Sequence, residues 1–354
     1  MNEIILKAQD LDGYLSPEDK TVISQMDEKY NQALEEFTRL TEKSESAARE
    51  GAKERLISLY NEMGDMMREI IQNEPQIHVY SFETPSAIHG ESSRLIAKLR
   101  NVTTENPEFV YYTQRAYELL FNLAFGSRSN KSRNYIFVKT PVDIPVQNYA
   151  VHKIPDVDRW VSNSVMCVML RAALLPSMIV SKEIQEYSSN NYVTPFALFR
   201  ISRDDSKEEY NMAYTLDLKK SYFDLEALDG KDLFFADPMN ATGGSLVTIV
   251  KYLQEQGVKP RSIKFFNVIS VLKGSLRIVR AIEHAEVYTL WMDPRLNNKA
   301  YILPGLGDAG DRINGADRME HPRNIIQLIA DYGAGIASLY RDQVKQIEET
   351  VLGS

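Results

Sequence analysis

One stretch of the chain constrains the fold more than any other: an apolar strand, an acidic residue, a short loop of small residues and then a helix. The strand is predicted at 232–236, Asp237 follows it, and the helix begins near Leu246. In an open α/β sheet, ligands bind beyond the carboxyl ends of the strands, where such loops lie. The glycines allow backbone N–H groups to approach a phosphate, and the helix N-terminus adds unpaired donors. The stretch therefore predicts an α/β domain with a site for a ribose 5-phosphate.

The loop between this strand and helix combines hydroxyl-bearing residues with glycines. Asp237 is suited to accept hydrogen bonds from vicinal sugar hydroxyls, whereas Thr242 and Ser245 can donate to a phosphate. No Gly-Lys-Ser or Gly-Lys-Thr follows, so the loop is not a nucleoside-triphosphate P-loop. The predicted site consists of Asp237, Pro238, Met239, Asn240, Ala241, Thr242, Gly243, Gly244 and Ser245.

Apolar patterns through the middle of the chain alternate between helix and strand, which indicates a largely parallel sheet. The polar stretch 200–229 lacks a regular pattern, so we expect a long loop or a hairpin there. The expected core elements are a helix at 92–125, a strand at 165–170, a strand at 232–236, a helix at 246–256, a strand at 263–271, a helix at 274–282 and a strand at 285–291.

Both ends of the chain carry amphipathic helical patterns. Residues 16–74 predict two helices, as a hairpin or as one interrupted helix, and Ser16-Pro17 supplies an N-cap with proline at the first helical position. A last helix is expected from Asn324 to the C-terminus. We expect these helices to serve packing or oligomerisation, the alternative being a recognition role for their methionine-rich stripe.

Composition excludes several classes of protein. The 354 residues carry a formal net charge of −8 and no long basic block, which argues against a nucleic-acid binder. The longest apolar stretch, 164–180, contains Arg171 and Pro176 and is too short to span a bilayer. A single cysteine, Cys167, indicates a buried thiol in a reducing compartment. We therefore expect a cytoplasmic protein without membrane or nucleic-acid partners.

A second segment adds a glycine-rich loop around two acids: Tyr301-Ile302-Leu303-Pro304-Gly305-Leu306-Gly307-Asp308-Ala309-Gly310-Asp311-Arg312. This segment closely resembles the uracil-binding loop of uracil phosphoribosyltransferases, and the loop 237–245 resembles the phosphate loop of that family. Fainter similarity runs through 198–200 and 170–173 back to 95–100, so the resemblance covers roughly 77–316.

The resemblance implies a type I phosphoribosyltransferase fold with a small hood, and the reaction of uracil with phosphoribosyl pyrophosphate (PRPP) to give UMP and pyrophosphate. It divides the chain into an N-terminal helical extension (1–76), a catalytic domain (77–316) and a C-terminal helical extension (317–354). It also implies Mg²⁺, bound mainly through pyrophosphate, and a homo-oligomer. The roles that it assigns are Arg171 and Arg200 for pyrophosphate, Asp237 for the ribose hydroxyls, 241–245 for the 5-phosphate, the backbones of Ile302, Gly307 and Ala309 for uracil, and Asp308 for PRPP, directly or through Mg²⁺.

Several assignments have alternatives. Arg203 competes with Arg200, which we prefer, and Asp311 can pair with Arg312 to close its loop. The five histidines lack metal-ligand spacing and are expected to be surface or core residues. Tyr210 and Tyr214 belong either to a hood over the site or to an exposed hairpin.

Two departures from the family pattern bear on activity. Ala173 replaces a glycine, and its methyl group could obstruct a backbone that must approach pyrophosphate. Asn240 replaces an apolar residue. Alternatives to the uracil enzyme are therefore a sensor of PRPP, uracil or UMP with little catalysis, and a phosphoribosyltransferase for another base.

Overall fold

A nine-stranded mixed sheet forms the centre of the computed structural model, which describes residues 3–41, 46–83, 85–126, 133–142, 146, 148–315, 325, 327–328 and 339–353. The strand order is β1-β7-β6-β5-β8-β10-β11-β2, and β9 pairs with β10. The run from β6 to β2 is parallel, whereas β7 and β1 add antiparallel strands at one edge. The strands are β1 (Glu3–Lys7), β2 (Ile77–Val79), β5 (Ser164–Leu170), β6 (Phe196–Arg203), β7 (Ala213–Tyr222), β8 (Asp232–Ala236), β9 (Met239–Asn240), β10 (Ser262–Val271) and β11 (Ala285–Asp293).

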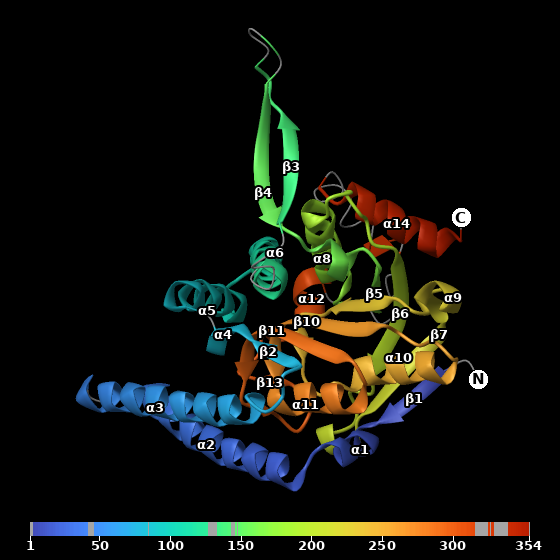
Figure 1. The fold of residues 1–354 in the computed structure, drawn as a ribbon. Coiled ribbons are helices and arrows are strands. Elements are labelled where there is room, and N and C mark those ends of the chain that lie inside the picture. The colour runs from blue at the N-terminus through green and yellow to red at the C-terminus, as the bar shows by residue number, and fades with distance from the viewer. Residues whose placement is uncertain are drawn as a thin grey trace.

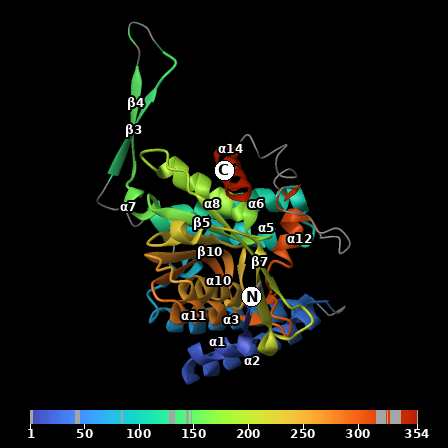
Figure 2. The ribbon, with the colours of Figure 1, turned by 90° about the vertical axis from the view of Figure 1, so that its right-hand side faces the viewer.

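Helices cover both faces of the sheet, as Figure 1 and Figure 2 show. Every residue of β5 and of β8 is buried, as expected for parallel strands that are covered on both sides. One face is covered by α5 (Ser86–Arg100), α6 (Asn106–Phe121) and α8 (Leu174–Tyr187), and the other by α10 (Gly244–Glu255) and α11 (Leu272–Ala281).

The N-terminal helices form an antiparallel hairpin beneath α11. They are α2 (Pro17–Thr41) and α3 (Ser46–Ile71), and they share a small apolar core with α11 and the ends of β2 and β11. Arg280 of α11 fixes this layer, because its guanidinium donates to the carboxylates of Asp19 and Glu74.

A two-stranded hairpin projects away from the body of the molecule (Figure 1). It consists of β3 (Arg133–Lys139) and β4 (Tyr149–Pro155), which pair antiparallel. The remaining elements are short, apart from α14: α1 (Ala8–Leu11), η1 (Asp12–Tyr14), α4 (Tyr80–Glu83), η2 (Asn122–Gly126), α7 (Asp158–Val161), η3 (Glu209–Asn211), α9 (Leu225–Leu228), β12 (Arg295–Leu296), β13 (Ile302–Leu303), α12 (Ala309–Asn314) and α14 (Arg341–Leu352).

The expected α/β architecture is confirmed, with strand boundaries within two residues of prediction in β5, β8, β10 and β11. The stretch 200–229 forms a hairpin, because β6 and β7 pair antiparallel, and the helical pattern at 92–125 divides into α5, α6 and the π-helical turn η2. Most of the last predicted helix before Leu339 lies outside the described residues, and α14 forms its end. Within the described ranges, no helix combines the length and the apolar character that crossing a membrane requires.

The predicted division of the chain at residue 76 stays a prediction. The structure adds that residues 3–7 pair with Ala213–Asp217 of β7, so the N-terminal segment contributes a strand to the same sheet as the middle of the chain.

Candidate functional site

The candidate site is a cleft of about 290 Å³ at the carboxyl ends of β5, β6 and β8. Strand β5 lies between β6 and β8. After β5 the chain adds β6 and β7 on one side, and it then crosses to the other side of β5 to form β8 and β10. This reversal of strand order is where open α/β sheets bind ligands. The walls come from the ends of these strands and from the loop before α12: residues 169–172, 201–203, Asp205, Asp237, Met239, Ala241, Ser245, 300–302 and 307–310.

Asp237 lies in the floor of the cleft, directly after β8. Its backbone N–H donates to the carbonyl of Phe266, and its Oδ1 accepts from the N–H of Met239 at 3.1 Å, which fixes the turn. Burial raises the pKa of Asp237 to about 7, an effect reinforced by the nearby Asp308 and opposed by Arg203. A carboxyl group with this pKa can accept hydrogen bonds from hydroxyls once it ionises.

The backbone of the phosphate loop is held where only glycine fits. Gly243 has a φ of 75°, and a Cβ at this residue would lie 2.8 Å from the carbonyl oxygen of Gly274. A Cβ at Gly244 would lie 2.2 Å from the ring of Tyr214, and one at Gly274 would lie 2.5 Å from the carbonyl oxygen of Ala241. The loop is thus packed between β7 and the start of α11 and leads directly into α10, whose first turn offers backbone donors.

Two polar residues of this loop face away from the cleft. Thr242 is buried and its Oγ1 accepts a hydrogen bond of 2.5 Å from the hydroxyl of Tyr214. Asn240 is also buried, and its Nδ2 donates to Ser270. The departure at Asn240 from the family pattern therefore lies in the packing behind the loop.

The loop before α12 has its own anchors. Gly305 adopts a φ of 64°, and a Cβ there would lie 2.2 Å from the carbonyl oxygen of Ile302. Its N–H donates to Oδ2 of the buried Asp293 at 2.9 Å. Asp308 caps α12 by accepting from the N–H of Asp311. The shape of this loop is therefore set by backbone geometry and buried acceptors.

The ion pair between Asp311 and Arg312, which the sequence left as an alternative, is absent from the described contacts. Asp311 instead accepts from Nη2 of Arg171 at 2.9 Å, and Arg171 also donates to the carbonyl of Gly315. Arg312 turns inward and donates to four carbonyls while its guanidinium stacks 4.1 Å above the Phe109 ring. The physical reason is that Arg312 meets the carbonyls after α5, whereas Asp311 points across the cleft to Arg171.

Arg203, and not the preferred Arg200, lines the cleft. Its Nε donates to Asp205 at 2.8 Å, and its guanidinium lies 4.7 Å above the ring of Tyr301. Arg200 is not among the residues that line the cleft. Its backbone N–H donates to the hydroxyl of Ser221. Asp205 was not among the predicted site residues, and Tyr301 was quoted as part of its loop without a role. Alternation along β6 places Arg200 and Arg203 on opposite faces, but this signal could be used only once the stretch was known to be a strand.

The remaining alternatives have clear outcomes. Ala173 is fully buried in the core and is not among the residues that line the cleft, and its effect on pyrophosphate binding stays a prediction. Tyr210 is exposed, but Tyr214 is buried against the phosphate loop, so the interpretation of both as exposed aromatics is wrong for Tyr214. Cys167 is buried, as expected. Within the described residues, no cluster of three or more histidine, cysteine or acidic side chains could hold a metal ion alone.

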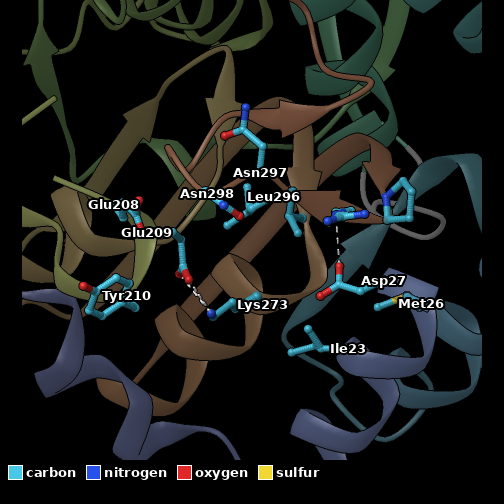
Figure 3. Close-up of a pocket in the computed structure, with 13 residues that line it drawn as sticks. Ile23, Met26, Asp27, Glu208, Glu209, Tyr210, Lys273, Leu296, Asn297 and Asn298 are labelled. Atoms are coloured by element: carbon cyan, nitrogen blue, oxygen red, sulfur yellow. Dashed lines mark hydrogen bonds and ion pairs between the residues drawn. The ribbon is translucent and has the colours of Figure 1, made fainter. Parts of the chain in front are cut away.

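A second cavity, of about 310 Å³, lies between α2 and the loop that carries η3 (Figure 3). In this view Glu209 faces Lys273, whose Nζ donates to it at 2.9 Å. Glu209 also accepts from Nη1 of Arg277, which is fully buried. Arg277 donates further to the carboxylate of Asp12 and to the carbonyl of Thr242. A network of charges thus joins the N-terminal segment to the phosphate loop.

The predicted site residues fall into two groups. Those on the cleft wall are Arg171, Asp237, Met239, Ala241, Ser245, Ile302, Gly307, Asp308 and Ala309. Those that support the wall or lie apart from it are Arg200, Pro238, Asn240, Thr242, Gly243 and Gly244. Residues from the phosphate loop and from the loop before α12, about 60 positions apart in the sequence, thus meet at one cleft, as the α/β switch-point geometry requires.

The chain was compared with protein-family models, with curated proteins and with solved structures. A family model described as uracil phosphoribosyltransferase matches residues 196–316. The chain is 31% identical over 216 residues to the uracil phosphoribosyltransferase of Campylobacter concisus (strain 13826), a match that covers 61% of this chain and 91% of that protein. It is 34% identical over 182 residues to that of Campylobacter fetus subsp. fetus (strain 82-40), covering 51% of this chain and 77% of the relative. Among solved structures, AQ2163 from Aquifex aeolicus overlaps 64% of this chain and 96% of its own, with a TM-score of 0.46 and 22% identity.

Proposed function

Because the chain belongs to the uracil phosphoribosyltransferase family, we propose that it transfers the phosphoribosyl group of PRPP to uracil and that the cleft at the ends of β5, β6 and β8 carries this reaction. The products are UMP and pyrophosphate. The observation that carries the proposal is the meeting of the phosphate loop and the loop before α12 around Asp237.

The phosphate loop is proposed to hold the 5-phosphate and Asp237 the ribose. Ala241 and Ser245 line the cleft at the start of α10, where a helix N-terminus favours an anion. Asp237 lines the same cleft, and the ribose attached to that phosphate is proposed to extend toward it. Its ionised carboxylate accepts from the ribose hydroxyls and orients the anomeric carbon.

Arg171 and Arg203 are proposed to meet the pyrophosphate. Both guanidinium groups lie on the cleft wall, and each is paired with an aspartate, Arg171 with Asp311 and Arg203 with Asp205. Pyrophosphate carries more charge than a carboxylate and accepts bidentate hydrogen bonds from arginine, so it competes for both groups. Charge that develops on the leaving group is then stabilised by donors already in place.

The loop before α12 is proposed to bind uracil through its backbone. Ile302, Gly307 and Ala309 line the cleft together with Arg203 and Tyr301. Uracil presents an acceptor–donor–acceptor edge, which backbone N–H and C=O groups can match. Cytosine changes that pattern and would leave buried groups unpaired, which is a strong basis for discrimination.

Mg²⁺ is the proposed cofactor, and the chemistry of the cleft fits it. Asp237 and Asp308 bring two carboxylates close enough for Asp308 to raise the pKa of Asp237, and a hard cation between them would relieve that repulsion. These residues alone do not complete a cage, which suits an ion bound mainly through pyrophosphate oxygens. When bound, Mg²⁺ would neutralise charge on the leaving group.

The function is tested by nucleotide formation from radiolabelled bases with PRPP and Mg²⁺. We expect UMP from uracil and at least about a hundredfold lower kcat/KM for cytosine, hypoxanthine and adenine, in keeping with a site built to pair a hydrogen-bonding edge. Turnover of another base in preference to uracil would point to a different specificity on the same fold. Binding of PRPP without any product would instead support a sensor.

We also propose that the protein is a homo-oligomer, supported by apolar side chains on the projecting β3–β4 hairpin. Tyr135, Phe137 and Val151 are all exposed, although isolated hairpins with exposed rings are rarely stable in water. Light scattering at micromolar concentration is expected to give a dimer or larger species, and Phe137→Asp is expected to shift it toward monomer. Lys139→Asp, which adds a carboxylate on the same strand without removing a ring, serves as the control. A monomeric wild-type chain would contradict the proposal.

A further inference from the structure

The N-terminal helix α2 contacts a segment that leads into the cleft. This segment is the ribbon of β12 and β13, in which Arg295 pairs with Leu303 and Leu296 pairs with Ile302. Ile302 lines the cleft, whereas Arg295 does not. A ladder of two residue pairs needs outside support, since even longer two-stranded hairpins are only marginally stable in water. The position of Ile302 therefore depends on what holds the other strand of the ribbon.

Arg295 connects this ribbon to α2. Its Nη1 donates to Oδ1 of Asn31 at 2.5 Å, and its Nε lies 3.4 Å from Oδ1 of Asp27. The dashed line from Asp27 in Figure 3 marks this ion pair. The guanidinium also lies 5.7 Å from the centre of the ring of Tyr30, which is buried. A planar guanidinium with several donors can make all three contacts at once.

The three partners of Arg295 form one face of α2. Asp27, Tyr30 and Asn31 are spaced by three and four residues, so they lie on the same side of the helix within about one turn. The rings of Tyr30 and Tyr60 of α3 meet edge to face at 6.5 Å, and Met26 belongs to the apolar core shared with α3 and α11. Helix α2 is thus fixed by its own packing and can act as a rigid support for the short ribbon.

The turn at the far end of the ribbon is held in a different way. Oδ1 of Asn297 accepts from the N–H of Tyr301, which shapes the turn. The carbonyl of Asn298 accepts from the N–H of Glu209, which ties the tip of the turn to η3. Among the described hydrogen bonds and ion pairs of the ribbon and its turn, those of Arg295 are the ones that reach α2.

We propose that Arg295 is a positioning residue for uracil: through Asn31 and Asp27, helix α2 sets the place of β13 and hence of the backbone of Ile302 in the cleft. The inference rests on the proposed binding of uracil by the loop before α12. It gives the N-terminal hairpin, which lies outside the residues 196–316 matched by the family model, a part in base binding. The ribbon contains no residue of the phosphate loop, so the effect is on uracil and not on PRPP.

The first test is the steady-state kinetics of UMP formation with Arg295→Met, which removes the guanidinium. We expect the KM for uracil to rise at least about fivefold, because a misplacement of about 1 Å can cost up to about a hundredfold. The KM for PRPP is expected to stay unchanged. Asn31→Leu, which removes the acceptor at an exposed position of α2, is expected to raise the KM for uracil as well, whereas Asn31→Asp keeps an acceptor and the wild-type value. An unchanged KM for uracil in the first two variants, or an equal rise in the KM for PRPP, would overturn the proposal.

A double variant tests whether the effect passes through the contact itself. Because residues in direct contact are not additive, we expect Arg295→Met combined with Asn31→Leu to raise the KM for uracil no further than Arg295→Met alone. Effects that multiply would overturn this route. Lys29→Met is the matched control, since Lys29 lies on the same helix but pairs with Glu62 of α3. We expect it to leave the KM for uracil unchanged, and a rise equal to that of Arg295→Met would overturn the route.

Hydrogen exchange provides a readout that needs no turnover. Amides that lose a support open locally and exchange faster, so we expect at least about tenfold faster exchange at 297–305 in Arg295→Met, with β5 and β8 unchanged. Asn31→Leu carries the same test if Arg295→Met does not fold. Unchanged exchange at 297–305 would overturn the support by α2. If the wild type forms no UMP, the proposed reaction fails, and hydrogen exchange still decides whether α2 holds the ribbon.

Discussion

Replacement of Asp237 by asparagine is expected to lower kcat/KM for PRPP by about 10²–10⁴-fold. The carboxylate is proposed to accept hydrogen bonds from two ribose hydroxyls, and each bond to a charged group contributes about 1.5–3 kcal/mol. Two such bonds correspond to about 3–6 kcal/mol, at about 1.4 kcal/mol for each tenfold change in rate. Initial rates at varied PRPP and saturating uracil measure the effect. Asp224→Asn, the same change at an exposed helix cap that asparagine also satisfies, is expected to leave the rate unchanged.

The pH dependence provides the internal control for this prediction. Since burial raises the pKa of Asp237 to about 7, the carboxylate form is lost as the pH falls through 7. We expect kcat/KM for PRPP in the wild type to fall about tenfold for each pH unit below 7, because this parameter reports ionisation of the free enzyme. The Asp237→Asn variant is expected to lack that acid limb. Persistence of the limb in the variant would show that another group controls it.

The fold should survive the change at Asp237. The raised pKa of Asp237 means that the folded state is more stable when this buried carboxyl is protonated. That contribution to folding stability is fully present at low pH and is lost as the pH rises through about 7. At pH 8 the wild type therefore carries a buried charge that asparagine avoids, while the amide oxygen can still accept from Met239. We expect the variant to melt at or above the wild-type temperature at pH 8. A lower melting temperature would mean that lost activity reflects lost structure.

Replacement of Arg277 by methionine is expected to destabilise the protein by about 3–5 kcal/mol, the usual cost of removing one partner from a buried ion pair. Arg277 is fully buried between Asp12 and Glu209, and it donates to the carbonyl of Thr242 at 3.4 Å. Methionine keeps an unbranched apolar side chain in place of the arginine methylenes but leaves both carboxylates without their guanidinium. Urea denaturation measures the loss, and we expect a rise of at least about fivefold in the KM for PRPP because the phosphate loop loses a support.

Two further variants separate stability from loop position. Lys273→Met removes the other cation on Glu209, but Lys273 is partly exposed and has no described contact with Thr242, so we expect a smaller loss of stability and an unchanged KM for PRPP. Arg277→Lys keeps the positive charge for the carboxylates and shortens the reach to Thr242, so we expect it to fold and still raise the KM for PRPP. A normal KM in both Arg277 variants would contradict a positioning role.

The sequence was most informative where local patterns act alone. The strand 232–236, the acid at its tip and the glycines of the following loop have their predicted places because apolar runs, turn residues and helix starts are short-range signals. The same signals placed the loop 237–245 at the carboxyl end of a strand in a largely parallel sheet. The family resemblance supplied the order of the loops, and the sheet topology brings both to one cleft.

The sequence was least informative about side-chain contacts between residues that lie far apart in the chain. Tyr214 is buried because its hydroxyl reaches Thr242, 28 residues later, and no local pattern reports that pairing. Asp311 pairs with Arg171, 140 residues away, and not with its neighbour Arg312. Arg203, and not Arg200, lines the cleft, and the sequence could not separate the two because a stretch interpreted as a loop or hairpin offered no fixed alternation to assign faces.

Strand β1 has a consequence for the order in which the protein can fold during synthesis. Residues 3–7 leave the ribosome roughly 200 residues before their partner strand, which extends from Ala213 to Tyr222. Chains are synthesised at about 5–20 residues per second, so β7, the partner of β1, is made roughly ten seconds or more after β1. Until then its backbone groups are satisfied by water or by a chaperone. The sheet edge next to β7 is therefore completed only after the residues between β1 and β7 have been translated, which makes closure of this edge a late event relative to the synthesis of β1.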